Sequence, residues 1–189
     1  MQRRHFLSLA GLFALPLQLF ANTRSRTPSQ TEGPFYPVKA IPVRHELIAN
    51  PESLLGEAIQ LSGRVVNTQG QPLAGIRVEI WQCDGQGLYD HPRQSQTERF
   101  DQHFLGFGAQ LTDREGRYRF HTLYPVPYTG PPHIHAKLWQ GDRELLTTQL
   151  YLQGQTGAHE WFSAGREHLQ IAPQRDAHNQ WQASFEFVV

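Results

Sequence analysis

Cysteine is nearly absent from this sequence of 189 residues, in which Cys83 is the only one. A single cysteine excludes an internal disulfide framework and any zinc or iron–sulfur site that needs several thiolates. Neither sign of charge dominates, because 17 lysines and arginines balance 17 aspartates and glutamates. The sequence therefore lacks the broad basic surface that binds phosphates, and we expect no nucleic-acid partner. The side chains left for chemistry are the ten histidines and six tyrosines.

Long hydrophobic runs are missing as well. An apolar stretch near the N-terminus, residues 6–21, falls short of the roughly 20 residues that span a bilayer. It follows Arg3 and Arg4 and ends at the small residue Ala21, which predicts a signal peptide over residues 1–21. The order R-R-H-F-L-S resembles the twin-arginine export signal, with an ordinary secretory signal and an uncleaved anchor as alternatives.

The expected location and tether follow from this signal. We expect a periplasmic or otherwise exported protein that meets the export machinery and has no stable membrane association after signal cleavage. Residues 22–30 are polar and predict a flexible tether. Cys83 in an exported protein is best explained as a small buried residue.

Short alternating segments between Gly and Pro turns make up the body of the chain. In residues 58–66 apolar and polar side chains alternate, which is the period of a half-buried strand. Further strands are expected at 75–82, 117–120, 133–139, 145–152 and 181–188. No segment has helical periodicity over more than two turns, so the chain predicts an all-β, antiparallel β-sandwich. Residues 86–108 form the longest stretch without strand character and predict a functional loop.

Two histidines and two tyrosines carry the strongest chemical signal. His133 and His135 lie two apart on an expected strand, so their side chains project from the same side. A Pro-rich loop places Tyr128 just before them, and a Gly-rich loop presents Tyr89. Taken singly, each tyrosine is also explained by packing. Together, two imidazoles and two phenolates form a hard donor set suited to Fe(III), whereas zinc prefers imidazole, thiolate or carboxylate.

Six motifs, in the same order, resemble the intradiol ring-cleavage dioxygenase family, to which protocatechuate 3,4-dioxygenase and catechol 1,2-dioxygenase belong. The motifs are T-E-G-P-F-Y-P at 31–37, W-Q-C-D-G-Q-G-L-Y at 81–89, L-T-D-R-E-G-R-Y-R-F at 111–120, P-V-P-Y at 125–128, P-H-I-H at 132–135 and T-T-Q-L-Y at 147–151.

The resemblance implies a prealbumin-like β-sandwich domain over residues 31–189 that holds one non-haem Fe(III) per chain. The implied metal ligands are Tyr89, Tyr128, His133 and His135. Tyr89, Tyr128 and Gln149 are the implied catalytic residues. The implied oxidoreductase acts in the catabolism of aromatic compounds. With O2 as co-substrate, it cleaves a small catecholic substrate between the two hydroxyl-bearing carbons and gives a muconate-type diacid. A homo-oligomer is left open.

One position departs from the family pattern. The family motif reads R-P-x-H-x-H, and its arginine is thought to stabilise charge on the ring as oxygen attacks. Here Gly130 stands in that place. By analogy with an oxyanion donor, losing such a group slows a reaction by roughly 10²–10³. Three outcomes are open: another residue substitutes, the substrate differs, or activity is lost.

Two other classes of function compete with this interpretation. The first is an exported prealbumin-like binding module without catalytic activity, in which Tyr89 and Tyr128 only pack and no iron is held. The missing arginine supports it, and the intact set of four ligands opposes it. The second is a different metalloenzyme, in which His91, His103 or His121 completes a zinc or copper site.

Overall fold

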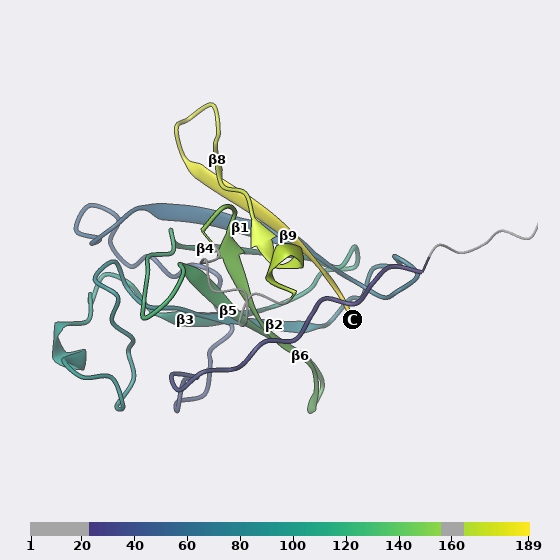
Figure 1. Cartoon of the computed structure of the whole chain (residues 1–189), viewed down its shortest axis with the longest axis horizontal. Helices are drawn as coiled ribbons and strands as arrows, with labels where there is room; N and C mark the ends of the chain where they lie inside the picture. Colours follow the sequence, from purple (N-terminus) through teal and green to yellow (C-terminus); the bar gives the residue numbers. More distant parts are fainter. Residues whose placement is uncertain (1–22, 156–164) are drawn as a thin grey trace, which may run out of the picture.

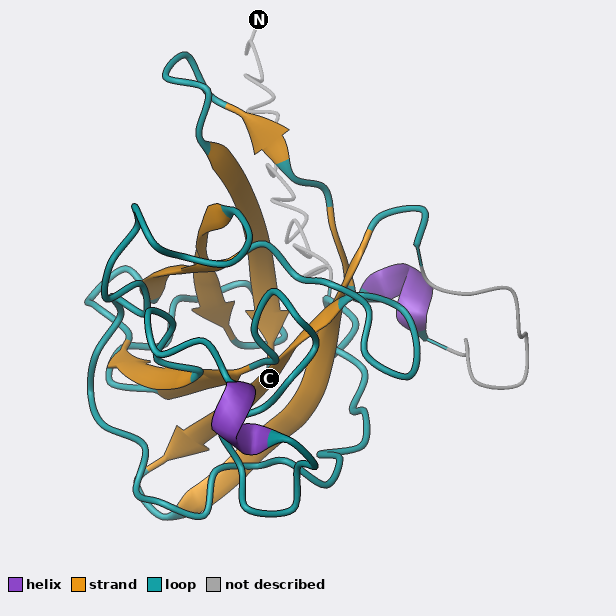
Figure 2. Cartoon of the chain, turned by 90° about the vertical axis from the view of Figure 1, so that its left-hand side faces the viewer, coloured by secondary structure: helices purple, strands orange, loops and turns teal. Residues whose placement is uncertain are grey.

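Two β-sheets packed face to face form the body of the molecule (Figure 1). The computed structural model describes residues 23–155 and 165–189, so the expected signal peptide over residues 1–21 lies outside the described residues. Within the described ranges no helix is long and apolar enough to cross a membrane. The strands are β1 (Ala58–Val66), β2 (Arg77–Trp81), β3 (Phe107–Leu111), β4 (Arg117–Leu123), β5 (His133–Gln140), β6 (Arg143–Leu152), β7 (Gln170–Ile171), β8 (Gln174–Arg175) and β9 (Trp181–Val188). Two short 3-10 helices, η1 (Thr97–Arg99) and η3 (Arg166–His168), are the helical segments in this part of the chain (Figure 2).

The strand order explains how the sandwich is built. One sheet has the order β4-β1-β9-β8 and the other has the order β3-β2-β5-β6-β7. Most neighbouring strands are antiparallel, but β9 runs parallel to β1 and β7 runs parallel to β6. Parallel neighbours need a long connection, and β9 returns to β1 only after the whole second sheet has been made. The predicted all-β sandwich is confirmed, with these two parallel pairs as the departure from a purely antiparallel one.

Alternation along the strands places the core between the sheets. On β1 the side chains of Ile59, Leu61 and Val65 are buried, as the periodicity predicts. They pack against the inner face of the other sheet, where Val78, Ile80, Ile134, Ala136 and Leu138 are also fully buried. Burying a side chain such as Leu contributes about 1.5–3 kcal/mol, so this layer is the main source of stability.

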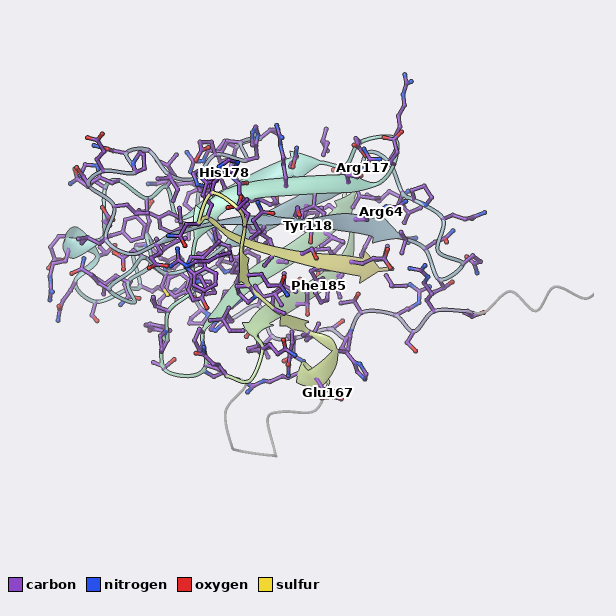
Figure 3. The ribbon with its side chains drawn as sticks, turned by 90° about the horizontal axis from the view of Figure 1, so that it is seen from above. Arg64, Arg117, Tyr118, Glu167, His178 and Phe185 are labelled. Carbon is purple, nitrogen blue, oxygen red and sulfur yellow. The ribbon has the colours of Figure 1, made fainter. Side chains whose placement is uncertain are left out.

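β1 and β9 approach each other closely at one glycine. A Cβ atom on Gly63 would lie 1.7 Å from the carbonyl oxygen of Phe185, so only glycine fits there. The hydroxyl of Tyr118 on β4 donates a hydrogen bond of 2.9 Å to the same oxygen. Tyr118 and Phe185 therefore join β4 to β9 across β1 (Figure 3).

Three strands lie outside the predicted segments. β3 begins in the last two residues of the predicted loop over residues 86–108 and continues to Leu111. It was not predicted, because Gly108 interrupts the alternation of apolar and polar side chains. A Cβ on Gly108 would lie 2.5 Å from the carbonyl oxygen of Arg44, which marks a close approach of two backbones. β7 and β8 have two residues each, too few to show a period.

A second cluster of buried side chains lies on the outer face of the five-stranded sheet. Its members are Phe35, Ile41, Trp81, Cys83, Tyr89, Phe107 and Ala109. The N-terminal segment over residues 31–43 crosses this face and covers it, so β5 is buried on both sides. The strand expected over residues 133–139 is therefore covered on both faces, because chain from far away in the sequence packs on the face that carries His135 and Lys137.

Residues 23–30 run as an extended segment along the surface of the sandwich (Figure 1). The amide of Thr27 donates to the carbonyl of Val188 on β9, and the amide of Gln30 donates to the carbonyl of Thr147 on β6. Arg24 also pairs with Glu186. The flexible tether expected for residues 22–30 is not supported for residues 23–30, because their main-chain hydrogen bonds tie them to both sheets.

Candidate active site

Strand register brings the two histidines together with Trp81 and Gln149. On the outer face of the sheet, His135 on β5 stands opposite Trp81 on β2 and opposite Gln149 on β6. His133 stands opposite Tyr151 on β6. The Nε2 atoms of His133 and His135 are 3.1 Å apart, and the two rings cross at 80°.

Both imidazole rings are held in place by their surroundings. Nδ1 of His133 lies 2.8 Å from the carbonyl oxygen of Pro131. A carbonyl only accepts, so Nδ1 carries the proton and Nε2 of His133 presents a lone pair to the site. The ring of His135 stacks on Trp81 with centroids 4.7 Å apart. A Cβ on Gly33, where φ is +77°, would lie 3.4 Å from Cε1 of His135, so the glycine lets the segment over 31–37 pass close to the ring.

The surroundings of the two histidines favour the neutral form of both imidazoles. Burial lowers the pKa of His133 and lowers the pKa of His135 well below its ordinary value. The proximity of His133 lowers the pKa of His135 further. Neutral imidazoles are the form that binds a metal ion.

Both tyrosines converge on the same place from two different loops. Tyr89 follows β2, and Tyr128 lies between β4 and β5. Their ring centroids are 5.3 Å apart, and the ring of Tyr89 is 6.2 Å from that of His135. Phe35 stacks on Tyr89 at 4.7 Å and holds it from the side of the N-terminal segment. Burial raises the pKa of Tyr89, so its phenol keeps its proton unless a cation compensates.

All five predicted site residues line one pocket of about 190 Å³. They are Tyr89, Tyr128, His133, His135 and Gln149. Gln149 is fixed by two hydrogen bonds: its amide donates to the carbonyl of Thr31 at 2.8 Å, and its Oε1 accepts from the hydroxyl of Tyr151 at 2.7 Å. The sequence analysis predicted no role in the site for Trp81, Tyr151 or Arg166. Trp81 and Tyr151 lie in motifs already noted, whereas Arg166 lies outside every motif.

These residues fit a ferric ion on the chemistry of the donors. Two Nε2 atoms 3.1 Å apart repel unless a proton or a cation lies between them, and His133 presents a lone pair there. Across the described ranges no group of three or more His, Cys, Asp or Glu side chains is arranged to hold a metal. The oxygen donors that line this pocket beside the two histidines include the phenols of Tyr89 and Tyr128. An imidazole and phenolate set favours Fe(III) over zinc.

The alternative zinc or copper site finds no support from the remaining histidines. Nδ1 of His91 accepts a hydrogen bond from the amide of Arg93, and its ring packs edge-on against Phe35. His121 pairs with Glu46 at 2.7 Å. Neither these two nor His103 joins a metal-binding group within the described part of the chain.

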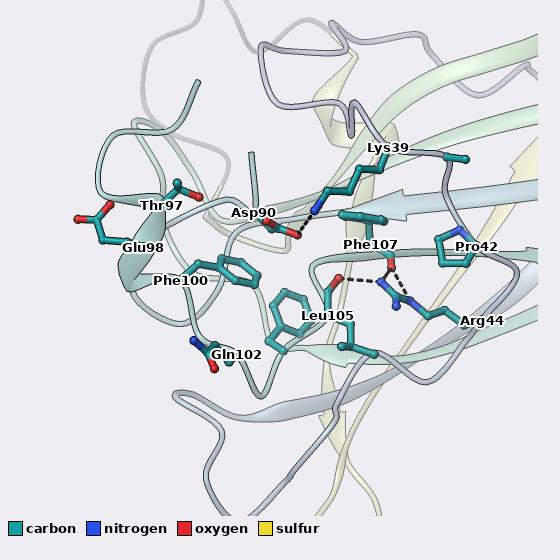
Figure 4. A pocket seen from close by; sticks show the side chains of 12 residues that line it. Lys39, Pro42, Arg44, Asp90, Thr97, Glu98, Phe100, Gln102, Leu105 and Phe107 are labelled. Atoms are coloured by element: carbon teal, nitrogen blue, oxygen red, sulfur yellow. Dashed lines mark hydrogen bonds and ion pairs between the residues drawn. The ribbon is translucent and has the colours of Figure 1, made fainter. Parts of the chain in front are cut away.

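A larger pocket of about 560 Å³ lies beside the loop that carries η1 (Figure 4). Its walls include Lys39 and Asp90, whose charged groups are 4.0 Å apart. Arg44 also lines it, but its guanidinium donates to the carbonyls of Leu105 and Phe107 and is engaged in holding the loop. No tyrosine or histidine lines this pocket, so its size does not make it the catalytic site.

Sequence comparison identifies related proteins. A family model described as "Dioxygenase" matches residues 31–132. The beta chain of protocatechuate 3,4-dioxygenase from Burkholderia cepacia is 38% identical over 126 residues, which are 60% of this chain and 53% of that protein. Catechol 1,2-dioxygenase from Candida albicans is 31% identical over 152 residues, which are 67% of this chain and 47% of that protein. This chain therefore spans about half the length of both relatives.

Solved structures agree in fold. The dioxygenase domain of a dioxygenase carbohydrate-binding protein fusion from Streptomyces sp. SirexAA-E superposes with a TM-score of 0.71 and 30% identity, covering 87% of this chain and 98% of that chain. An intradiol ring-cleavage dioxygenase from Tetranychus urticae superposes with a TM-score of 0.70 and 20% identity, covering 87% and 94%. The second likeness supports the fold alone.

Proposed function

We propose that this chain, which belongs to the intradiol ring-cleavage dioxygenase family, is a non-haem Fe(III) enzyme that opens a catecholic ring with O2. Its relatives are named for protocatechuate, catechol, hydroxyquinol and chlorocatechol. These compounds share two adjacent hydroxyl groups on an aromatic ring, and that unit is the substrate class we propose. The bond between the two hydroxyl-bearing carbons breaks, and both atoms of O2 enter the two carboxyl groups of a muconate-type diacid.

The observation that carries this proposal is the convergence of two neutral imidazoles and two phenols on one pocket. His133 and His135 would hold the metal through their Nε2 atoms, and Tyr89 and Tyr128 would hold it through their phenolic oxygens. When bound, ferric iron withdraws electron density from a chelated catecholate and makes the ring reactive toward O2.

The two tyrosines differ in how tightly they are packed, and this difference supports separate roles for them. Tyr89 is only 3% exposed and is stacked on Phe35, so it is a fixed ligand. Tyr128 is half-buried on a loop and is followed by Thr129, whose φ of +44° is strained for a β-branched residue. Tyr128 is therefore the tyrosine better able to move and to accept a hydroxyl proton from the substrate at its phenolic oxygen.

Metal content and colour test the proposal directly. Protein purified without added metal should contain about one iron per chain and show a broad visible band from tyrosinate-to-Fe(III) charge transfer. Tyr89→Phe and Tyr128→Phe should each shift or weaken this band, because phenylalanine has no oxygen to offer. Tyr118→Phe is the matched control: it removes a buried hydroxyl that bonds to Phe185 outside the pocket, so the band should stay unchanged.

The histidines give a second arm of the same test. His133→Ala and His135→Ala should lower iron content more severely than the tyrosine variants, whereas His121→Ala, which removes a partner of Glu46, should not. Oxygen uptake with catechol and the appearance of a diacid establish the reaction. A colourless protein with stoichiometric zinc would overturn the assignment, and a metal-free protein that still binds catechols would favour the binding module.

We also propose that the protein is exported and loses about its first 21 residues, on the strength of R-R-H-F-L-S and the apolar stretch that ends at Ala21. Replacing Arg3 and Arg4 with Lys should block export by the twin-arginine route. Continued export of that double variant would leave the ordinary secretory route as the explanation.

A further inference from the structure

Arg166 lines the pocket that holds the predicted ligands, although it lies outside every motif. It begins η3, which follows β6 in the chain and precedes β7. Its guanidinium carbon lies 4.8 Å from the ring centroid of Tyr151, the residue opposite His133 on the neighbouring strand. Tyr151 in turn donates its hydroxyl to Gln149. Arg166, Tyr151 and Gln149 therefore form one wall of the site.

Packing fixes the base from which Arg166 projects. Leu169, at the end of η3, is fully buried and its carbonyl accepts a hydrogen bond of 2.9 Å from the amide of Tyr151. On the other side of Arg166, a Cβ on Gly165 would lie 3.2 Å from Pro28, so η3 begins against the N-terminal segment. The next residue, Glu167, lies at the edge of the molecule, on the opposite side from Arg117 (Figure 3).

The charge of the pocket comes from this arginine. Among the described residues that line it, Arg166 carries the only permanent charge and none is acidic. The positive charge of a side chain that lines the pocket favours a negatively charged ligand.

A second wall of the pocket, at Gly130, leaves a place open. Gly130, where the family pattern has an arginine, lines the same pocket. A Cβ built on Gly130 meets only the carbonyl oxygen of Tyr128, at an ordinary 3.8 Å. Its backbone is outside the left-handed region, so the local conformation does not demand glycine. A side chain is therefore tolerated at residue 130, and glycine leaves that wall without a charge.

We propose that Arg166 supplies the cation that faces the anionic catecholate in this chain, from η3 instead of from residue 130. This inference rests on the proposed function and assigns the charge-stabilising residue of that site. Arg166 contacts the deprotonated ring, stabilises its negative charge when it binds, and stabilises it further as oxygen attacks. It is not a metal ligand, so iron content does not depend on it.

The test compares Arg166→Gln and Arg166→Lys with the wild type. Dissociation constants are measured with 4-nitrocatechol, a slowly reacting probe, from the change in the visible spectrum, and kcat/KM is measured with catechol. Arg166→Gln should weaken probe binding about 10-fold and lower kcat/KM about 10²-fold, while iron content and the resting colour stay unchanged. Arg166→Lys should recover part of the probe affinity and part of kcat/KM, because lysine keeps the positive charge.

Arg175→Gln is the matched control. Arg175 stacks on Trp181 at 4.3 Å, a contact of the same kind outside the pocket, so its loss should change thermal stability slightly and probe binding not at all. The decisive variant is Arg166→Gln combined with Gly130→Arg. If the site needs a cation from either wall, this double variant should regain at least 10-fold in kcat/KM over Arg166→Gln alone.

Three results would overturn the assignment. Arg166→Gln could leave both constants within twofold of the wild type. It could lose iron and stability together, without rescue by Gly130→Arg, which would make Arg166 a structural residue. It could weaken only 3,4-dihydroxybenzoate and leave catechol unaffected, which would make it a reader of a ring carboxylate. A wild-type protein without iron or ring-opening activity would instead refute the proposed function, before any variant is compared.

Discussion

Both faces of β5 are covered, but they differ in what covers them. Ile134, Ala136 and Leu138 face the other sheet and belong to the hydrophobic core. His135 and Lys137 face outward, and each is only 5% exposed because the N-terminal segment lies over them. The inner face gains stability from apolar contact alone. The outer face buries polar groups that need partners, which is the setting in which an imidazole stays neutral and can hold a metal.

Both faces of β5 are therefore covered, and the two faces differ only in which residues cover them. On the outer face, Trp81 stacks on His135, and Phe35 stacks on Tyr89. Lys137 pairs with Glu32 and lies 4.3 Å from the ring centroid of Tyr36. The motif over residues 31–37 thus acts as a lining for the site. Variants on the two faces should separate stability from metal binding.

The largest expected effect lies on the inner face. Leu138→Ala should lower the free energy of unfolding by about 2–5 kcal/mol, because it deletes fully buried methyl groups and leaves a cavity. The folded fraction should keep its iron and its visible band. Urea unfolding and metal analysis measure both quantities. Loss of the band in protein that is still folded would show that the two faces are not independent.

A smaller effect is expected at Gly33, where the outer cover passes close to the proposed ligand His135. Gly33→Ala should cost about 1–2 kcal/mol, because alanine is strained at a φ of +77°. The new methyl group also meets Cε1 of His135, so iron affinity should fall several-fold.

Gly75→Ala is its control. Gly75 has a φ of +71° and open space around its Cβ position, so it carries the same strain without a neighbour. The two variants should lose similar stability in urea unfolding, and only Gly33→Ala should lose iron affinity. Equal iron affinity in both would mean that Gly33 does not position His135.

Lys137→Met should cost about 1 kcal/mol of the free energy of unfolding, because methionine keeps the packing and the freed carboxylates are reached by water. Glu32 and Glu144, the two partners of Lys137, are 42% and 45% exposed. The double variant with Glu32→Gln should show less than the sum of the two single losses. A loss of 3 kcal/mol or more would show that the outer cover is drier than these exposures indicate.

The smallest expected effect is the slow reaction of Cys83 with a thiol reagent. Burial, followed by the nearby charge of Asp84, raises the pKa of the Cys83 thiol to about 12, so almost no thiolate is present at pH 8. A thiol reagent should therefore label the native protein slowly and the urea-unfolded protein at once. Rapid labelling of native protein would show that the cover over the outer cluster opens readily.

Where a structural feature depends only on neighbouring residues, the sequence alone was sufficient to predict it. Alternation gave β1 and β9 with the boundaries that the structure has, because a period of two depends only on neighbouring residues. The pair His133 and His135 was recognisable for the same reason, and Tyr89 and Tyr128 followed from motifs around them. The family itself could be identified from those motifs.

Only the tertiary structure decided which chain covers which face. No local pattern shows that residues 31–43 cross the outer side of β5, or that residues 23–30 bond to both sheets. Arg166 is an ordinary arginine in the sequence, and it reaches the pocket only because η3 packs against β6. The physical reason is that periodicity reports only the alternation of a strand's own side chains. A cover supplied by a segment far away in the sequence leaves no period in the strand that it covers.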